Sequence, residues 1–182
     1  MSPHRPDEEM REHNRSTPSR RIVSMTASKL LTTALVLAGL LNLTTALRRT
    51  IVSTPHAPAA IGPYSQAVML EFKSGERMVH AAGQIGMDPA SGELVPGGIE
   101  NQTHRALSNV EAIMTAAGAK MADVVECTVL MANLTEYAAL NGVYAKFFDA
   151  DNAPARAAFQ VGGLPKGAGT EIKCTAAIAD EA

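Results

Sequence analysis

The segment GIENQTHRALSNVEAIMTAAG, residues 98–118, carries the strongest structural signal in this chain. Its apolar and small side chains recur three and four residues apart, which is the spacing of one helix face. These positions are Ile99, Thr103, Ala106, Leu107, Val110, Ile113, Met114 and Ala117. Gly118 follows directly, where a glycine commonly ends a helix. The pattern predicts one long helix whose apolar face must pack against a sheet or another helix.

Short apolar segments on both sides of this helix are typical of strands. The expected strands span residues 50–53, 67–72, 77–82, 124–131, 155–161 and 171–179. Residues 73–76, Lys-Ser-Gly-Glu, predict a hairpin turn between the second and third strands. A second helix follows the fourth strand, with Asn133 or Thr135 as its N-terminal cap. Its apolar face would consist of Tyr137, Leu140, Tyr144, Phe147 and Phe148.

The resulting order is β-β-β-α-β-α-β-β, which predicts an α+β domain with two helices on one face of a mixed sheet. The strands carry small apolar residues on both faces, and two helices in about 130 residues cannot cover both of them. An uncovered apolar sheet face implies self-association. We therefore expect a closed homo-oligomer.

Charge is distributed unevenly along the 182 residues, whose formal net charge of −2 disfavours a general nucleic-acid binder. Residues 1–49 contain eight basic and four acidic side chains, whereas residues 50–182 contain eight basic and fourteen acidic ones. All seven aromatic residues lie beyond position 50. We therefore expect a basic leader, residues 1–47, ahead of one acidic globular domain, residues 48–182.

The leader has the features of a targeting segment. Residues 1–24 are polar and without periodicity, which is typical of disorder. Residues 30–47 are uncharged, with a strongly apolar centre only over 34–41, shorter than a membrane span requires. A secretory-type signal, with Lys29 as its basic flank if translation begins at Met25, and a mitochondrial or plastid import signal both fit. A retained anchor and a misplaced start codon, which would leave the protein cytoplasmic, stay open.

The chain has few residues that could bind a metal. Cys127 and Cys174 are the only cysteines, and both lie in apolar runs, so we expect buried free thiols rather than a disulfide. They lack the spacing of a zinc site. His80 and His104 lie far apart in the sequence, with no ligand spacing. No metal is therefore expected.

Four further motifs resemble those of one family. They are AIGPYSQA (60–67), GQIGMDP (83–89), PARAAFQV (154–161) and LPKG (164–167). In this order and spacing they are similar to the RidA/YjgF family of enamine and imine deaminases, and most closely to its eukaryotic members. The resemblance extends from about residue 48 to about residue 180.

The resemblance implies a chorismate-mutase-like fold and a homotrimer around a central β-barrel, with active sites between subunits. It also implies hydrolysis of reactive 2-imino or enamine acids, such as 2-iminobutanoate and 2-iminopropanoate, to 2-keto acids and ammonia. No metal or cofactor takes part in that metabolite-repair reaction. The expected partners are further copies of this chain and small 2-imino and 2-keto acids, and no nucleic acid is expected.

The resemblance also implies a set of site residues. Arg156 would bind the substrate carboxylate, because a planar guanidinium matches that group bidentately, and the backbone amide of Ala158 would be a second donor. Tyr64, after a rigid Gly-Pro turn, would pack against the substrate and offer a hydroxyl. Asn141 would border the pocket, and Gly83 would let the backbone approach a ligand. The plainer alternatives are a surface arginine, a core tyrosine and a solvated asparagine.

Two positions depart from the family pattern. A serine usually precedes Gly83, but Ala82 has no hydroxyl. The glutamate thought to position or activate the attacking water aligns with Lys173, and a protonated ammonium cannot act as a base. Glu171, on the same strand face about 7 Å away, can substitute for it. Otherwise Lys173, deprotonated by Arg156 and burial, is the base, or catalysis is weak.

We therefore expect a hydrolytic deaminase, with Arg156, Tyr64, Lys173 and Glu171 as catalytic candidates. The alternative is a non-catalytic member of the family that binds small carboxylates or a protein partner. Ribonuclease activity, with which the family is also associated, is disfavoured because the eight basic residues of the acidic domain do not cluster in sequence.

Overall fold

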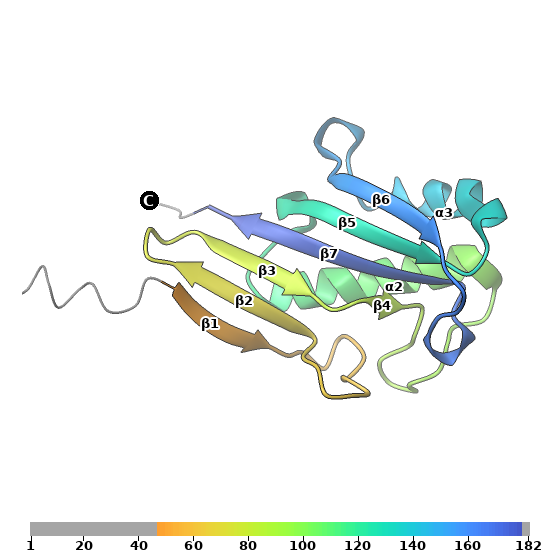
Figure 1. The fold of residues 1–182 in the computed structure, drawn as a ribbon, viewed down its shortest axis with the longest axis horizontal. Coiled ribbons are helices and arrows are strands. Elements are labelled where there is room, and N and C mark those ends of the chain that lie inside the picture. The colour runs from red at the N-terminus through yellow and green to blue at the C-terminus, as the bar shows by residue number, and fades with distance from the viewer. Residues whose placement is uncertain (1–46, 180–182) are drawn as a thin grey trace, which may run out of the picture. The chain divides into compact units, whose positions relative to one another are not determined.

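The structure, a computed structural model, describes residues 47–179 (Figure 1). The strands are β1 (Leu47–Val52), β2 (Ala67–Phe72), β3 (Arg77–Ala81), β4 (Gln84–Ile85), β5 (Val124–Met131), β6 (Ala155–Gln160) and β7 (Thr170–Ile178). The helices are α2 (Gly98–Ala116) and α3 (Tyr137–Tyr144). Single 3₁₀ turns span Met121–Asp123, Leu134–Glu136, Ala150–Asn152 and Pro165–Gly167.

All strands join one sheet in the order β1-β2-β3-β7-β5-β6, and β4 pairs with β7. Neighbouring strands are antiparallel, except that β5 and β6 are parallel. A parallel pair needs a crossover connection, and here α3 provides it. The sheet is therefore mixed, which confirms the predicted α+β class.

One face of this sheet is covered by the two helices. α2 packs against β3, β4 and β7, and also against α3, and lies behind the sheet in Figure 1. Burial along β7 alternates accordingly: Ile172, Cys174 and Ala176 are buried beneath the helices, whereas Lys173 and Ala177 are exposed. A period of two is the pattern of a sheet that is covered on a single face.

No helix covers the opposite face within residues 47–179. The strand register places a row of apolar side chains there, and Phe159 among them is 55% exposed. The row consists of Val68, Leu70, Met78, Leu130 and Phe159. Apolar surface of this kind favours association with another surface. The expected self-association has this support, and the homotrimer stays a prediction.

The long helix matches its sequence pattern at both ends. Gly97 (φ 101°) and Gly118 (φ 77°) flank it, both in the left-handed region that favours glycine. Near its middle, the fully buried Asn109 donates hydrogen bonds from Nδ2 to the carbonyls of Ile85, at 3.2 Å, and Met87, at 2.9 Å. The helix thereby fixes β4 and the residues that follow it.

Three elements differ from the prediction. The second helix, whose expected apolar face extends to Phe148, ends at Tyr144. β1 begins at Leu47 rather than residue 50, because it pairs with β2 along its whole length. β4 lies outside the strands expected from the sequence, and it forms because its two residues find partners on β7. Both strands depend on pairing with distant residues, which a local pattern does not reveal.

The leader lies outside the described residues, apart from Leu47. Within residues 47–179, no helix has the length and apolar character needed to cross a membrane.

Cys127 and Cys174 form a disulfide, so the expectation of free thiols was wrong. They lie directly opposite each other on β5 and β7, with Cα atoms 4.2 Å apart. Side chains opposite each other on antiparallel strands point to the same face and lie close together. The pairing could not be predicted from the sequence, because it depends on the register of two strands whose cysteines are 47 residues apart.

Reduction of this disulfide should destabilise the protein. The bond joins residues 47 apart, and a cross-link of that span contributes about 4 kcal/mol by restricting the unfolded chain. We expect tris(2-carboxyethyl)phosphine to lower the free energy of unfolding measured in urea. The double variant Cys127→Ala/Cys174→Ala should show no effect of the reductant. Identical unfolding curves of the parent chain with and without reductant would contradict the assignment.

Candidate functional site

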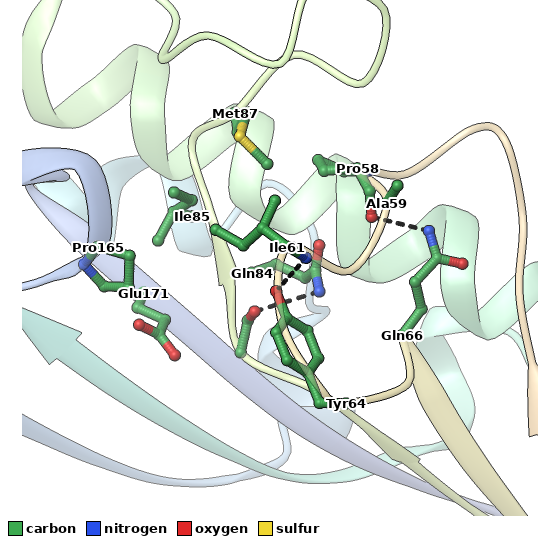
Figure 2. Close-up of a pocket in the computed structure, with 11 residues that line it drawn as sticks. Pro58, Ala59, Ile61, Tyr64, Gln66, Gln84, Ile85, Met87, Pro165 and Glu171 are labelled. Carbon is green, nitrogen blue, oxygen red and sulfur yellow. Dashed lines mark hydrogen bonds between the residues drawn. The ribbon is translucent and has the colours of Figure 1, made fainter.

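The first concave region is a pocket of about 90 Å³, which we call the Glu171 pocket (Figure 2). It is lined by Pro58, Ala59, Ile61, Tyr64, Gln66, Gly83, Gln84, Ile85, Met87, Pro165 and Glu171. These residues come from the loop before β2, from β4 and its neighbours, from the turn that contains Pro165, and from the start of β7. The motifs at 60–67, 83–89 and 164–167, which are distant in sequence, therefore meet at one place.

Gln66 anchors the loop that forms one wall of the pocket. This side chain is only 5% exposed, and both ends of its amide are hydrogen-bonded. Oε1 accepts from the Thr54 N–H at 2.6 Å, and Nε2 donates to the carbonyls of Thr54 at 3.0 Å, Ala57 at 3.1 Å and Pro58 at 2.8 Å. The buried amide thus replaces regular secondary structure in holding this loop in place.

Tyr64 and Gln84 supply further polar groups at the pocket. The Tyr64 hydroxyl accepts a hydrogen bond from the Ile61 N–H at 3.2 Å, and the side chain is half exposed. Gln84 is buried, and its Nε2 donates to the carbonyls of Ala82 at 3.3 Å and Gly83 at 3.2 Å. Figure 2 shows the Tyr64 ring and the Glu171 carboxylate at the same pocket.

Glu171 packs directly on the backbone of Gly83. A Cβ atom at position 83 would lie 1.9 Å from Oε1 of Glu171, so this arrangement needs a glycine. Burial raises the pKa of the Glu171 carboxyl above its ordinary value of 4.5, and no ion pair within the described residues opposes that shift. A carboxyl of raised pKa at a pocket is a candidate for proton transfer.

The second concave region is an open groove between α3 and β6, which we call the Arg156 groove. It is lined by Asn141, Tyr144, Ala145, Phe148, Ala150, Ala153, Pro154 and Arg156. The Arg156 guanidinium lies over the Tyr144 ring, with Cζ 4.4 Å from the ring centroid. Its Nη2 donates a hydrogen bond to the Tyr137 hydroxyl at 2.8 Å. The PARAAFQV motif and the second helix therefore meet here.

Two polar atoms in the Arg156 groove are buried without a hydrogen-bond partner among the described residues. They are the Tyr144 hydroxyl and Oδ1 of Asn141. Burial raises the pKa of Tyr144 to about 12, against the opposing effect of the Arg156 charge, so the hydroxyl stays protonated. The groove thus offers a cation, a neutral hydroxyl and an amide oxygen.

These two regions lie on opposite faces of the sheet. Arg156 pairs with Cys127, and therefore lies on the helix-covered face. Glu171 pairs with Leu130 and belongs to the uncovered face, because its neighbour Ile172 points into the core. A single chain therefore does not bring Arg156 and Glu171 to one ligand.

The expected site residues are divided between the two regions. Tyr64, Gly83 and Glu171 line the Glu171 pocket, with Ala82 adjoining it through its carbonyl. Asn141 and Arg156 line the groove, with the Ala158 amide on the same strand.

Lys173 lines neither region. Its side chain is exposed in the single chain, on the face of the sheet opposite Arg156. The hypothesis that Lys173 is the base stays a prediction.

Four contributors were not singled out from the sequence as site residues: Gln66, Gln84, Tyr137 and Tyr144. The two tyrosines were assigned to the apolar face of the second helix. A usable signal was present, because Tyr137, Asn141 and Tyr144 recur at i, i+4 and i+7 and so share one helix face. Within residues 47–179, no group of three or more His, Cys, Asp or Glu side chains could hold a metal ion.

Known proteins resemble this chain over the same region. A family model described as Endoribonuclease L-PSP matches residues 54–178. A Capra hircus protein named 2-iminobutanoate/2-iminopropanoate deaminase is 49% identical over 128 residues, which are 70% of this chain and 89% of that protein. Reactive Intermediate Deaminase A, chloroplastic, of Arabidopsis thaliana is 39% identical over 131 residues, 72% of this chain and 67% of that one.

A solved structure agrees with these sequence matches. E. coli TdcF with bound serine is 38% identical, with a TM-score of 0.64, over 71% of this chain and 99% of that one. The chorismate-mutase-like fold implied by the sequence motifs is thereby confirmed. The matched model, the level of identity and the coverage together show that this chain belongs to the RidA/YjgF family.

Proposed function

We propose that this protein hydrolyses reactive 2-imino and enamine acids, such as 2-iminobutanoate and 2-iminopropanoate, to 2-keto acids and ammonia. The observation that carries the proposal is the Glu171 carboxyl, whose pKa burial raises, beside Tyr64 in a pocket formed by three family motifs. The name of the Capra hircus relative supports the same reaction.

Arg156 binds the substrate carboxylate in this proposal. Its guanidinium is half-buried, and no ion pair within residues 47–179 neutralises it. A guanidinium with free N–H groups forms paired, charge-assisted hydrogen bonds to a carboxylate. β6 is an edge strand, so backbone N–H groups near Ala158 are available as further donors.

Glu171 acts as the general base. Its carboxylate removes a proton from water as the water oxygen attacks C2 of the imine, which gives a carbinolamine. That proton passes to the imine nitrogen to complete the carbinolamine. The carboxylate then takes the carbinolamine hydroxyl proton and delivers it to the amine, so that ammonia leaves as the C=O bond forms. An enamine first takes up a proton at C3 to become the imine. The balance is one imine and one water consumed for one 2-keto acid and one ammonia.

A complete site requires a second copy of the chain. Because Arg156 and Glu171 lie on opposite faces of one sheet, we assign the two regions of each active site to different subunits of a homotrimer. The exposed apolar row on the uncovered face supports association through that face. An organelle destination for the leader has the support of the chloroplastic relative, and rests otherwise on the sequence of residues 1–47.

A non-catalytic carboxylate-binding role was motivated by Lys173. The case for that role is weaker in the structure, because Lys173 lines neither concave region of the chain and Glu171 lines the pocket. Lys173 has no role in the reaction proposed here.

Removal of Arg156 should abolish recognition of the carboxylate. We expect the full chain to release 2-keto acid from freshly generated 2-iminobutanoate faster than buffer does, and Arg156→Ala to lower kcat/KM by about 10²-fold. Arg105→Ala is the matched control, because Arg105 is an arginine of α2 whose only ion pair within residues 47–179 is to Asp88 at 3.9 Å. Equal activity of Arg156→Ala and the parent chain would refute the carboxylate role.

The pH dependence of kcat/KM should report Glu171. A general base must be ionised, and a raised pKa moves its titration to higher pH, so activity should fall on acidification through a value above 4.5. Glu171→Gln should remove this acidic limb and lower kcat by about 10²-fold. Lys173→Gln, changed on the same strand face, should retain the limb. Loss of the limb in Lys173→Gln alone would assign the base to Lys173 instead.

Gly83→Ala tests the contact that positions the carboxylate. The new methyl group would occupy the place of the Glu171 carboxylate, which is the movable end of a side chain, so the fold survives while the base is displaced. We expect a loss of kcat of at least about tenfold with an unchanged circular dichroism spectrum. Gly163→Ala is the control, because a Cβ atom there meets nothing within 4 Å. Full activity of Gly83→Ala would exclude this placement of Glu171.

A further inference from the structure

Arg156 has little lateral support from its own strand. Its neighbours Ala155 and Ala157 point to the opposite face of the sheet, and Ala158, on its own face of this edge strand, is too small to pack along a long side chain. An arginine side chain has many rotamers, and each hydrogen bond to a ligand requires one of them. Whatever orients the guanidinium must therefore come from another element.

Helix α3 supplies that support from two sides. The Tyr144 ring lies under the guanidinium, 4.4 Å from Cζ, whereas the Tyr137 ring is farther from it, at 5.5 Å. Tyr137 acts instead through its hydroxyl, which accepts from Nη2 of Arg156 at 2.8 Å. Arg156 carries donors only, so the hydroxyl oxygen is the acceptor. One stacking contact and one directional hydrogen bond together restrict the plane of the guanidinium and its rotation within that plane.

We propose that Tyr137 is a positioning residue, whose hydroxyl holds the Arg156 guanidinium over the Tyr144 ring in the orientation that receives a substrate carboxylate. The bond occupies one N–H of Nη2, and leaves the remaining N–H groups of the fork for the two carboxylate oxygens. The proposal rests on the proposed function, in which Arg156 binds that carboxylate.

The geometry separates binding of the substrate carboxylate, which depends on Arg156, from attack of water at C2, which depends on Glu171. Tyr137 touches Arg156 and lines neither concave region, so it affects how well the carboxylate is bound and not how water attacks C2. Its loss should therefore appear in KM and in the affinity for a carboxylate. kcat, which reports Glu171, should change little.

The test uses Tyr137→Phe in the full chain, because this variant removes one oxygen atom and retains the ring. We expect KM for 2-iminobutanoate to rise about fivefold, with kcat within twofold of the parent value. The dissociation constant of the product 2-oxobutanoate, measured by isothermal titration calorimetry, should rise by the same factor. Unchanged KM and an unchanged dissociation constant would overturn the proposal.

A double-mutant cycle separates positioning from a general structural role. Tyr137→Phe introduced into Arg156→Ala should produce no further loss of kcat/KM, because the group that it positions is absent. An equal loss in both backgrounds would mean that Tyr137 acts through the fold, and would overturn the proposal. If the parent chain hydrolyses no imine, the proposed function fails, while 2-oxobutanoate binding still decides the role of Tyr137.

Discussion

The two-residue alternation of β5 and β7 is the constraint on which the arrangement depends. Both strands lie in the middle of the sheet, and their buried residues must face the helices. Because directly paired residues lie on the same face of a sheet, this alternation also fixes which residues of β3 and β6 face the helices. Arg156, which pairs with Cys127, therefore lies on the helix-covered face. Glu171, one residue before the buried Ile172, lies on the opposite face. A shift of register by one residue would exchange them, and would expose the core.

The separation of Arg156 from Glu171 has an electrostatic consequence. An adjacent guanidinium would lower the pKa of a carboxyl, whereas the isolated Glu171 has a pKa raised by burial. In the assembled site proposed above, a substrate carboxylate neutralises the arginine of one subunit beside the glutamate of another. The charge that binds the substrate is thus compensated by the substrate itself, and the base keeps its affinity for a proton.

Sequence patterns predicted those parts of the fold that depend on neighbours along the chain. β2 and β5 have the expected bounds, and α2 lies between its two glycines, because local periodicity and glycine conformation decide these elements. β4 and the disulfide between Cys127 and Cys174 were not predicted, since both depend on pairing between distant strands. The motifs pointed to Tyr64, Gly83 and Arg156, but not to their division between two faces.

The choice between Glu171 and Lys173 shows where pattern analysis ends. A period of two places both side chains on the same face, and it cannot rank them. The structure distinguishes them through a contact between separate segments: Glu171 fills the space above Gly83, where any other residue would carry a Cβ atom, and Lys173 lines neither concave region of the single chain. In the proposed reaction, proton transfer therefore depends on Glu171, for which a glycine on a neighbouring element leaves room.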